Sequence, residues 1–529
     1  RPSSSRGTII VPKLEDAVLA GGKRSAECSL LLTEGDSAKA LAVSGLQVVG
    51  RDCYGVYPLR GKLTNISGMD TKAALSVPEV SALVQILGLR PGADYSIPDE
   101  RRTLRYGRLI LFTDQDEDGS HIKGLVMNIF RCLWPSLLKI PFITTLETPL
   151  IKARRGSSTV PFYSRREYDR WAESVPDIDR WQIKYYKGLG TSTAAEAREY
   201  FSELEDRLVH YVWQEEEDQR SIEIAFDRQK ADERKRWIQS GSVTQNAMLQ
   251  TNIDRSPREL PYARFVNGEL RGFALQDLKR SIPSVVDGLK PSQRKILHTC
   301  LRLGDNKQEK VAQLASRVAH TCGYHHGEAS LVNAIVNMAQ DFVGTANVPL
   351  LTGIGQFGTR LAGGADAASA RYIYAALSPM ARALFPAADD ALLEPVVEEG
   401  VRVEPVWYCP ILPLVLINGA EGIATGWSTT VCPYDPRAIM DTVRARIEGS
   451  IDNESHTVDM LPYYSGFTGT IDRHPSNGRI RCSGRIDQLK GKSGKWNGLI
   501  SIDELPVGVW TSPYKERVLL PMVQRGEIR

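Results

Sequence analysis

The sequence predicts a mixed α/β protein of several domains, and three observations support that prediction. The chain has 529 residues, more than one hydrophobic core normally serves. Near its start, an apolar strand-like run is followed by a turn and a helical pattern, and this unit occurs twice. After Pro410 the chain is rich in Ile, Val, Thr and Gly with regular turn signals, which predicts mixed strand and helix.

The two strand-and-helix units place acidic turns at the ends of apolar strands. Residues 28–33 (CSLLLT) lead through the turn EGDS into the helical pattern AKALAVSGL. Residues 108–113 (RLILFT) lead through DQDEDG into the pattern HIKGLVMNIFRCLW. Strands that alternate with helices predict a mainly parallel sheet, whose functional groups gather at the carboxyl ends of the strands.

The middle of the chain predicts a connector and then a new domain. Residues 200–240 are highly charged with few apolar positions, which predicts a solvated helical connector. A new domain is expected to open near residues 259–261 (ELP), with short basic helical segments followed by the glycine-rich stretch 352–364.

Composition limits the class of protein more than it identifies a partner. Hydrophobic residues make up 42% and charged residues 24%, which indicates a soluble globular protein without extensive disorder. The net charge of +3 does not by itself indicate nucleic acid. The eight cysteines contain no C-x-x-C pair, so we expect free thiols in a reducing compartment. No run of about eighteen apolar residues is present, so no membrane partner is expected.

Three aspartates form the clearest candidate site. Asp114, Asp116 and Asp118 lie two apart just beyond a strand, so in an extended conformation they would point the same way. Such carboxylates repel one another unless water or a cation separates them, and hard oxygen ligands favour Mg²⁺. Glu34 ends the other strand, where a parallel sheet could bring it beside them. A solvated acidic turn and a calcium loop are the alternatives, and the calcium loop lacks its expected glutamate within 120–125.

These motifs resemble a known family. The order and spacing of residues 34–38 (EGDSA), 58–62 (PLRGK) and the three aspartates are similar to the TOPRIM domain of type IIA DNA topoisomerases. The resemblance implies that Glu34, Asp114 and Asp116 hold a catalytic Mg²⁺, and that Asp116 and Asp118 hold a second, more structural ion. Mn²⁺ or Ca²⁺ would substitute in binding. A cation there would neutralise the phosphodiester's non-bridging oxygens and its leaving 3′-oxygen.

A second group of motifs resembles the family's tyrosine region. Residues 356–360 (QFGTR) precede residues 371–374 (RYIY), and in the family the nucleophile directly follows the arginine. That implies Tyr372, because a tyrosine can stay bound to phosphate until the freed hydroxyl reverses the bond. Arg371 would stabilise the charge that develops on phosphorus. Tyr374 is expected to be a packing residue.

The resemblance also implies a set of residues that contact DNA. Residues 324–328 (YHHGE) resemble the eukaryotic form of a motif whose second histidine contacts the scissile phosphate, and 287–295 (DGLKPSQRK) resemble the start of a winged helix. Ile423 matches an apolar wedge that bends the duplex, with core packing as its alternative. The implied catalytic residues are Tyr372, Arg371, His326, Glu34 and Lys62. The implied DNA-binding residues are Arg60, Lys62, Asn65, Lys187, Arg280, Lys290, Arg294, Lys295, His325, His326, Gln356, Arg360 and Ile423.

From the resemblance we expect four domains. These are a Rossmann-like TOPRIM domain (1–155), its extension and charged helical connector (156–255), a winged-helix domain with the catalytic tyrosine (256–425), and a partial α/β tower domain (426–529). The TOPRIM and tyrosine parts lie on one chain, which favours the eukaryotic class. We expect a piece of a longer protein that lacks the exit-gate coiled coil, with ATP bound only by a region that precedes this chain.

The implied function is Mg²⁺-dependent, transient double-strand DNA cleavage through a 5′-phosphotyrosyl intermediate, followed by religation. Two strands need two tyrosines, so the expected partners are double-stranded DNA and a second copy of the chain, with the cleavage site also open to a small-molecule poison. The expected location is nuclear, with a mitochondrial or other organellar compartment as alternative. Two rival functions are a TOPRIM nuclease or primase without a covalent intermediate and a non-catalytic DNA-bending protein. The tyrosine region argues against the first rival, and the acidic cluster argues against the second.

Overall fold

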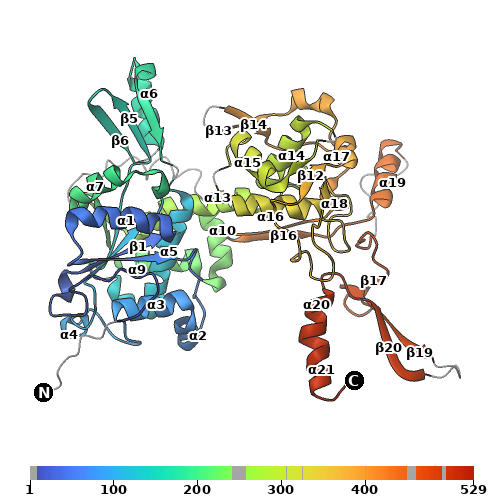
Figure 1. The fold of residues 1–529 in the computed structure, drawn as a ribbon, viewed down its shortest axis with the longest axis horizontal. Helices are drawn as coiled ribbons and strands as arrows, with labels where there is room; N and C mark the ends of the chain where they lie inside the picture. Colours follow the sequence, from blue (N-terminus) through green and yellow to red (C-terminus); the bar gives the residue numbers. More distant parts are fainter. Residues whose placement is uncertain are drawn as a thin grey trace. The chain divides into compact units, whose positions relative to one another are not determined.

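The chain folds into two compact units, Arg1–Asp277 and Leu278–Arg529 (Figure 1). The computed structural model describes residues 9–163, 165–186, 188–240, 258–305, 307–324, 326–398, 401–449, 460–490 and 496–529. The first unit is built on one large sheet, and the second combines a helical core with small sheets and hairpins. The predicted mixed α/β architecture is therefore confirmed.

A six-stranded, mainly parallel sheet forms the centre of the first unit. Its strand order is β2-β1-β3-β4-β8-β9. All neighbouring strands are parallel except β4 and β8, which are antiparallel. The strands are β1 (Ser29–Glu34), β2 (Tyr54–Leu59), β3 (Arg108–Phe112), β4 (Ile143–Leu146), β8 (Leu208–Val212) and β9 (Glu259–Pro261). The two strands expected from the sequence, β1 and β3, are adjacent and parallel, as predicted.

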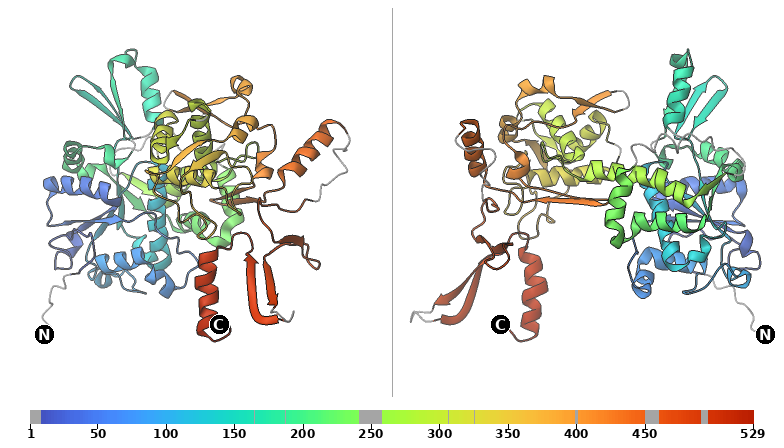
Figure 2. Two further views of the ribbon diagram at one scale, coloured as in Figure 1. Left: turned by 45° about the vertical axis from the view of Figure 1, so that its right-hand side comes forward. Right: turned by 180° about the vertical axis from the view of Figure 1, so that it is seen from behind.

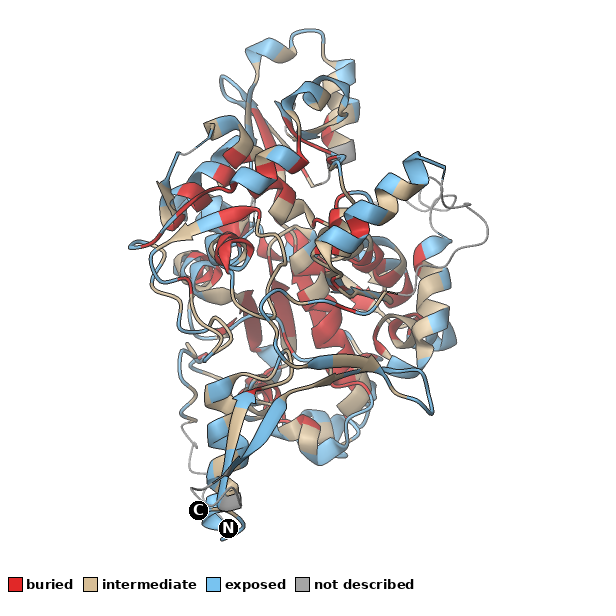
Figure 3. Ribbon diagram, turned by 90° about the vertical axis from the view of Figure 1, so that its right-hand side faces the viewer, coloured by how far each residue is buried: buried red, intermediate tan, exposed pale blue. Residues whose placement is uncertain are grey.

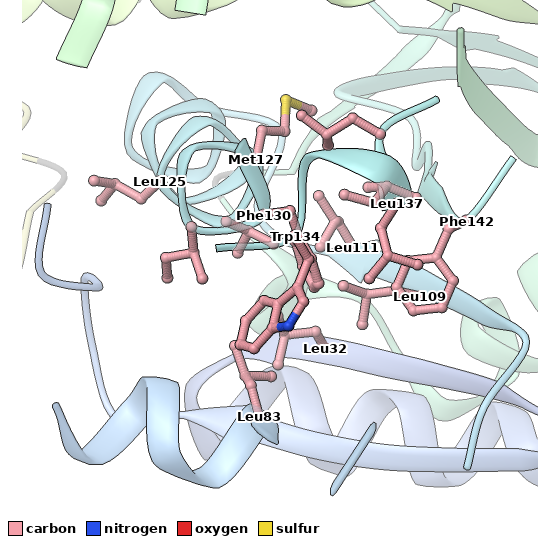
Figure 4. Packing of buried hydrophobic residues seen from close by; sticks show 14 of the residues in the cluster. Leu32, Leu83, Leu109, Leu111, Leu125, Met127, Phe130, Trp134, Leu137 and Phe142 are labelled. Atoms are coloured by element: carbon pink, nitrogen blue, oxygen red, sulfur yellow. The ribbon is translucent and has the colours of Figure 1, made fainter. Parts of the chain in front are cut away.

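Apolar side chains on both faces of this sheet bury it between two helical layers. Leu31 and Ile110 pack with α1 (Gly35–Val49) and α7 (Ala194–Ser202) on one face. Leu32, Leu109 and Leu111 pack on the other face with the helix α5 and with Trp134 just beyond it (Figure 4). The helices on this second side are α3 (Pro78–Leu87), α5 (Glu117–Leu133) and α9 (Glu215–Phe226). Burial on both faces is what a strand-and-helix pattern requires.

The charged stretch 200–240 differs from its prediction. It forms helices α9 and α10 (Ala231–Gln239), but it also supplies β8, in which Tyr211 is buried. Asp218 is fully buried and accepts hydrogen bonds from the backbone N–H groups of Gln214 and Ala263. The prediction of a solvated connector is therefore wrong, because the short apolar run LVHYV is hidden among charged residues yet joins the sheet.

The expected opening of a new domain near residue 259 also differs from the structure. Strand β9 pairs with β8 and completes the first unit's sheet. The unit continues through α12 (Tyr262–Phe265) and ends within α13 (Arg271–Ser281).

The first unit also contains a separate three-stranded sheet, β6-β5-β7, which packs against α6 (Arg165–Ser174) around Phe162 and Tyr168. Its strands are β5 (Ile151–Arg155), β6 (Ser158–Phe162) and β7 (Gln182–Tyr185).

Helices α14 (Pro291–Leu303), α15 (Val311–Thr321) and α16 (Glu328–Ala339) form the core of the second unit. They pack against a sheet of order β10-β12-β11, formed by Glu309–Lys310, Tyr374–Leu377 and Leu351–Ile354. The hairpin strands that follow are β13 (Pro395–Glu398), β14 (Val401–Pro405), β15 (Ala420–Ala424), β16 (Trp427–Val431), β17 (Thr470–Arg473), β18 (Ile480–Ser483), β19 (Arg485–Lys490) and β20 (Trp496–Glu504). The helices that follow include α17 (Pro379–Leu384), α19 (Pro436–Ile447) and α21 (Leu520–Gln524).

Mixed strand and helix after Pro410 were predicted and are confirmed. Within the second unit, the β19/β20 hairpin projects away from the helical core (Figure 2). The C-terminal elements are mostly exposed or half-buried, whereas buried residues concentrate in the cores (Figure 3).

The sequence expectation about the cysteines can be checked against the structure. All eight cysteines are free, as predicted. Across the described ranges, no helix has both the length and the apolar character needed to cross a membrane.

Candidate functional site

The parallel pairing of β1 and β3 brings the first two acidic residues together. Glu34 is the last residue of β1, and Asp114 follows β3 by two positions. The Asp114 N–H donates a hydrogen bond of 3.4 Å to Glu34 Oε2. The sheet therefore places Glu34 beside the aspartate segment, as the strand pattern predicted.

The three aspartates do not form the extended run expected from their spacing. Asp116 is the N-cap of α5, and its Oδ1 accepts a 2.7 Å bond from the Gly119 N–H. Asp118 lies in the first helical turn, where Lys62 Nζ is 2.6 Å from its Oδ1. The extended prediction fails after Asp116, because this capping residue starts the helix at Glu117 and acidic side chains favour a helix N-terminus.

The carboxylates of this acidic cluster (Glu34, Asp114, Asp116 and Asp118) interact electrostatically. Burial, followed by the charges of Asp114, Asp116 and Asp118, raises the pKa of Glu34 to about 7. Burial, and then the charge of Asp116, also raises the pKa of Asp114. In the described part of the chain, no group of three or more His, Cys, Asp or Glu side chains is arranged so that it could hold a metal ion without side-chain movement. A hard divalent cation nevertheless fits this donor set, since its charge would offset the repulsion that, after burial, raises both pKa values.

The residues expected beside the acidic cluster have different surroundings. Arg60 is exposed directly after β2. Lys62 pairs with Asp118, and its Nζ lies 4.7 Å from the ring centre of Phe273. Asn65 donates to the Phe226 carbonyl at 2.9 Å and accepts from Asn128 at 3.0 Å. Both ends of the Asn65 amide are thus engaged within the protein, and the DNA contact expected for it stays a prediction.

The tyrosine expected to be the nucleophile is presented on the surface of the second unit. Tyr372 is 70% exposed, while the next residue, Ile373, is 1% exposed and anchors the segment in the core. The Arg371 guanidinium lies 5.4 Å from the centre of the Tyr372 ring. Tyr374 begins β12, is 36% exposed, and has Lys310 Nζ 5.9 Å from its ring centre.

Two cations that were expected to contact the DNA backbone are buried in ion pairs. Arg294 binds Asp287, with Nε 2.8 Å from Oδ2. Lys295 Nζ lies 2.8 Å from Glu404 Oε1 and donates to the Cys322 carbonyl at 2.6 Å. A buried charge needs such partners, so these two ion pairs stabilise the core of the second unit, and their burial contradicts the DNA contacts expected for Arg294 and Lys295.

Arg360 is also engaged within the protein. It forms an ion pair with the buried carboxylate of Glu504 and donates to the Leu505 carbonyl at 2.8 Å. The charge of this guanidinium thus neutralises a buried acid, and the DNA contact expected for Arg360 stays a prediction.

The remaining predicted DNA contacts are placed as follows. His326 is exposed, with its ring packed edge-on against Tyr324 at 5.3 Å, and Gln356 is exposed. Lys290 is half-buried at the start of α14, and Arg280 lies in the last turn of α13. Lys187 and His325 lie outside the described residues.

Ile423 lies in β15 opposite Ser428 and is 74% exposed. Such exposure excludes the core-packing alternative and leaves this side chain accessible.

Sequence reasoning missed two neighbours of Asp114. The Leu189 N–H donates to Asp114 Oδ1 at 2.7 Å, and Gly188 lies directly against the same carboxylate. In the sequence, Gly188 and Gly190 directly follow Lys187, for which the resemblance implies only a DNA contact. No local pattern connects this turn to an aspartate 75 positions away.

Three family models match the chain in succession. They are the Toprim domain at residues 29–144, the C-terminal associated domain of TOPRIM at 146–278, and the A subunit of DNA gyrase/topoisomerase IV at 280–529.

Curated relatives and a solved structure match almost the whole chain. The putative DNA topoisomerase 2, mitochondrial, of Caenorhabditis elegans is 51% identical over 526 residues, covering 98% of this chain and 44% of the relative. DNA topoisomerase 2-alpha of Homo sapiens is 46% identical, covering 98% and 33%. The chain thus spans less than half the length of these relatives. The DNA-binding, cleavage and re-ligation domain of Plasmodium falciparum topoisomerase II has a TM-score of 0.72 and 40% identity, covering 98% of this chain and 68% of that one.

Proposed function

The chain belongs to the eukaryotic kind of type IIA DNA topoisomerases, and from this premise we propose that it is the part of the enzyme that cleaves and reseals DNA. Tyr372 attacks a backbone phosphate of double-stranded DNA and leaves the 5′ end bound to the protein. Religation reverses the step, because the freed 3′-hydroxyl attacks the phosphotyrosyl bond. In the longer protein, ATP bound outside this chain would couple the break to passage of a second duplex.

One observation carries this proposal: a tyrosine that is 70% exposed stands beside Arg371. A phenol that must reach a phosphate has to be accessible, and a buried one could not do so. In the cleavage step, the bond from Tyr372 Oη to phosphorus forms as the bond from phosphorus to the 3′-oxygen breaks. The phenol loses its proton and the 3′-oxygen gains one. Arg371 stabilises the charge that grows on the phosphoryl oxygens.

The Toprim family implies a divalent metal, and we propose Mg²⁺ at two positions. Glu34, Asp114 and Asp116 would hold the first ion, and Asp116 with Asp118 the second. The burial and mutual repulsion that raise the pKa of Glu34 support such a role for these carboxylates. When bound, the ion would stabilise the non-bridging oxygens and the leaving 3′-oxygen. Mn²⁺ or Ca²⁺ would bind to the same oxygens.

Exposed residues supply the proposed DNA contacts. Arg60, Lys62, His326 and Gln356 would bind the backbone, which carries no sequence information and suits an enzyme that acts at many sites. Two tyrosines are needed for two strands, so the active form would be a homodimer in which one subunit's tyrosine works with its partner's metal site. A small-molecule poison would bind where the strands are broken.

The division into TOPRIM, extension, winged-helix and tower domains stays a prediction, as does the nuclear location. The mitochondrial designation is that of the nematode relative.

Covalent capture tests the proposal directly. We expect the chain, incubated with duplex DNA and Mg²⁺ and then denatured, to remain linked to the 5′ ends of broken strands. Electrophoresis of end-labelled DNA before and after protease treatment measures this linkage, and EDTA added before the DNA is the control. Free 5′ phosphates without linked protein would instead indicate a nuclease, and intact DNA would indicate a binding protein.

Replacing the proposed wedge should reduce DNA bending. In Ile423→Ala the remaining methyl group is too small to hold a base step open, and unstacking that step costs a few kcal/mol, roughly. Fluorescence transfer between dyes at the two ends of a duplex measures the bend. The matched control is Ile447→Ala, since Ile447 is 81% exposed on α19. A bend that is equal in the two variants would remove Ile423 from this role.

A further inference from the structure

The turn that follows Lys187 lies directly against a carboxylate of the acidic cluster. The Leu189 N–H donates to Asp114 Oδ1 at 2.7 Å. A Cβ atom added at Gly188 would lie 2.5 Å from Asp114 Oδ2 and 3.0 Å from its Cγ. Asp114 Oδ1 thus accepts a hydrogen bond from an amide, and Asp114 Oδ2 lies too close to position 188 for any residue with a Cβ atom. Together the two contacts restrict the rotation of the Asp114 side chain.

The turn is itself held firmly. Leu189 is 3% exposed and packs in the same core cluster as Leu31 and Ile110, the side chains that bury one face of the sheet. The Thr191 N–H and its hydroxyl both donate to the Gly188 carbonyl, at 3.0 Å and 2.7 Å. The contact with Asp114 therefore comes from a fixed element.

Position 188 requires glycine because a Cβ atom there would clash with the Asp114 carboxylate. The backbone conformation does not itself require glycine. Gly188 has φ 174° and ψ 172°, an extended conformation that any residue adopts. Gly190 in the same turn offers the comparison: a Cβ atom there would find its nearest neighbour, Ser37 Cβ, at 4.0 Å. Only the first of these two glycines is pressed against the acidic cluster.

We propose that Gly188 and the Leu189 N–H are positioning groups, which fix the orientation in which Asp114 presents its carboxylate to a divalent cation. This inference rests on the proposed function. Ligands of metal sites are usually oriented by hydrogen bonds from a surrounding shell, and a carboxylate held in place loses less rotational freedom when an ion binds. The glycine-rich turn thereby acquires a role that is separate from any phosphate contact by Lys187.

Mn²⁺ binding by the chain without DNA tests the inference, with free Mn²⁺ measured by electron paramagnetic resonance. Gly188→Ala should weaken Mn²⁺ binding about tenfold or more, the usual effect of losing a supporting group around a metal. In cleavage, the same variant should need more Mg²⁺ for half-maximal rate and recover much of its rate at saturating metal. Gly190→Ala should bind Mn²⁺ as the unaltered chain does. Equal affinities for all three proteins would overturn the positioning role and leave the metal site standing.

Two further outcomes are informative. If the unaltered chain bound no Mn²⁺, the proposed metal site and the positioning role would both fail. If Gly188→Ala folded poorly, its fall in melting temperature in EDTA should vanish in an Asp114→Ala background, because the clash is with that side chain. A fall that persisted there would mean general damage to the fold and would overturn the inference.

Discussion

Tyr372→Phe should abolish covalent capture of DNA while the protein still folds and still binds DNA. The change removes only the hydroxyl that forms the bond to phosphorus, and the ring is 70% exposed, so no core contact depends on it. Denaturant trapping on end-labelled DNA measures the covalent product, and fluorescence anisotropy measures binding. Capture should fall below detection, because the proposed step uses the Tyr372 hydroxyl as its nucleophile.

Tyr374→Phe is the matched control, since Tyr374 lies two positions further on and makes the same chemical change possible. Its ring lies beside Lys310, and loss of its hydroxyl should leave capture intact. If Tyr374→Phe lost capture and Tyr372→Phe kept it, the nucleophile would be the second tyrosine and the family register would be off by two residues.

The acidic site could be predicted because its logic is local and topological. Apolar runs at β1 and β3 identified two strands, and parallel pairing then required their carboxyl ends to meet, which the contact between Glu34 and Asp114 bears out. The path after Asp116 was not predicted correctly. Spacing alone suggested an extended run, but the capping bond to Gly119 starts a helix, and so Asp118 projects from α5.

The contacts of individual cations could not be predicted, because a basic residue looks the same in sequence whether it faces solvent or a buried acid. Lys295 pairs with Glu404, more than a hundred positions away, and Arg360 pairs with Glu504. These partners are set by tertiary packing. The same holds for β8, whose short apolar run joins the sheet only because β4 and β9 flank it.

Removing one carboxylate from the acidic cluster should have the other large effect. In Asp114→Ala, the proposed site loses a ligand and a charge. Loss of a residue that only supports a metal ligand typically lowers activity by about 10- to 100-fold, so loss of the ligand itself should lower cleavage by roughly a hundredfold or more at ordinary Mg²⁺. Glu34→Gln should act in the same direction, and Mn²⁺ should restore part of the activity. A Mg²⁺ titration of cleavage in each variant measures both effects. Undiminished cleavage in Asp114→Ala would favour the solvated acidic turn.

Replacing Glu34 by Gln should make the protein more stable in the absence of metal. A loss of cleavage in this variant could then be assigned to the metal site and not to unfolding. The pKa of Glu34 is raised from 4.5 to about 7, so the fold disfavours its ionised form. The stability that this residue contributes is therefore complete below about pH 4.5 and is lost as the pH rises through about 7. Glu34→Gln, which mimics the protonated acid, should melt at a higher temperature than the unaltered chain at pH 8 in EDTA, and the gain should shrink at pH 5.

The control is Glu117→Gln, at an exposed position in the first turn of α5. It should show neither the gain in melting temperature nor the altered Mg²⁺ demand. A lower melting temperature for Glu34→Gln at pH 8 would mean that its ionised carboxylate stabilises the fold, contrary to the raised pKa that burial and the neighbouring aspartates give it.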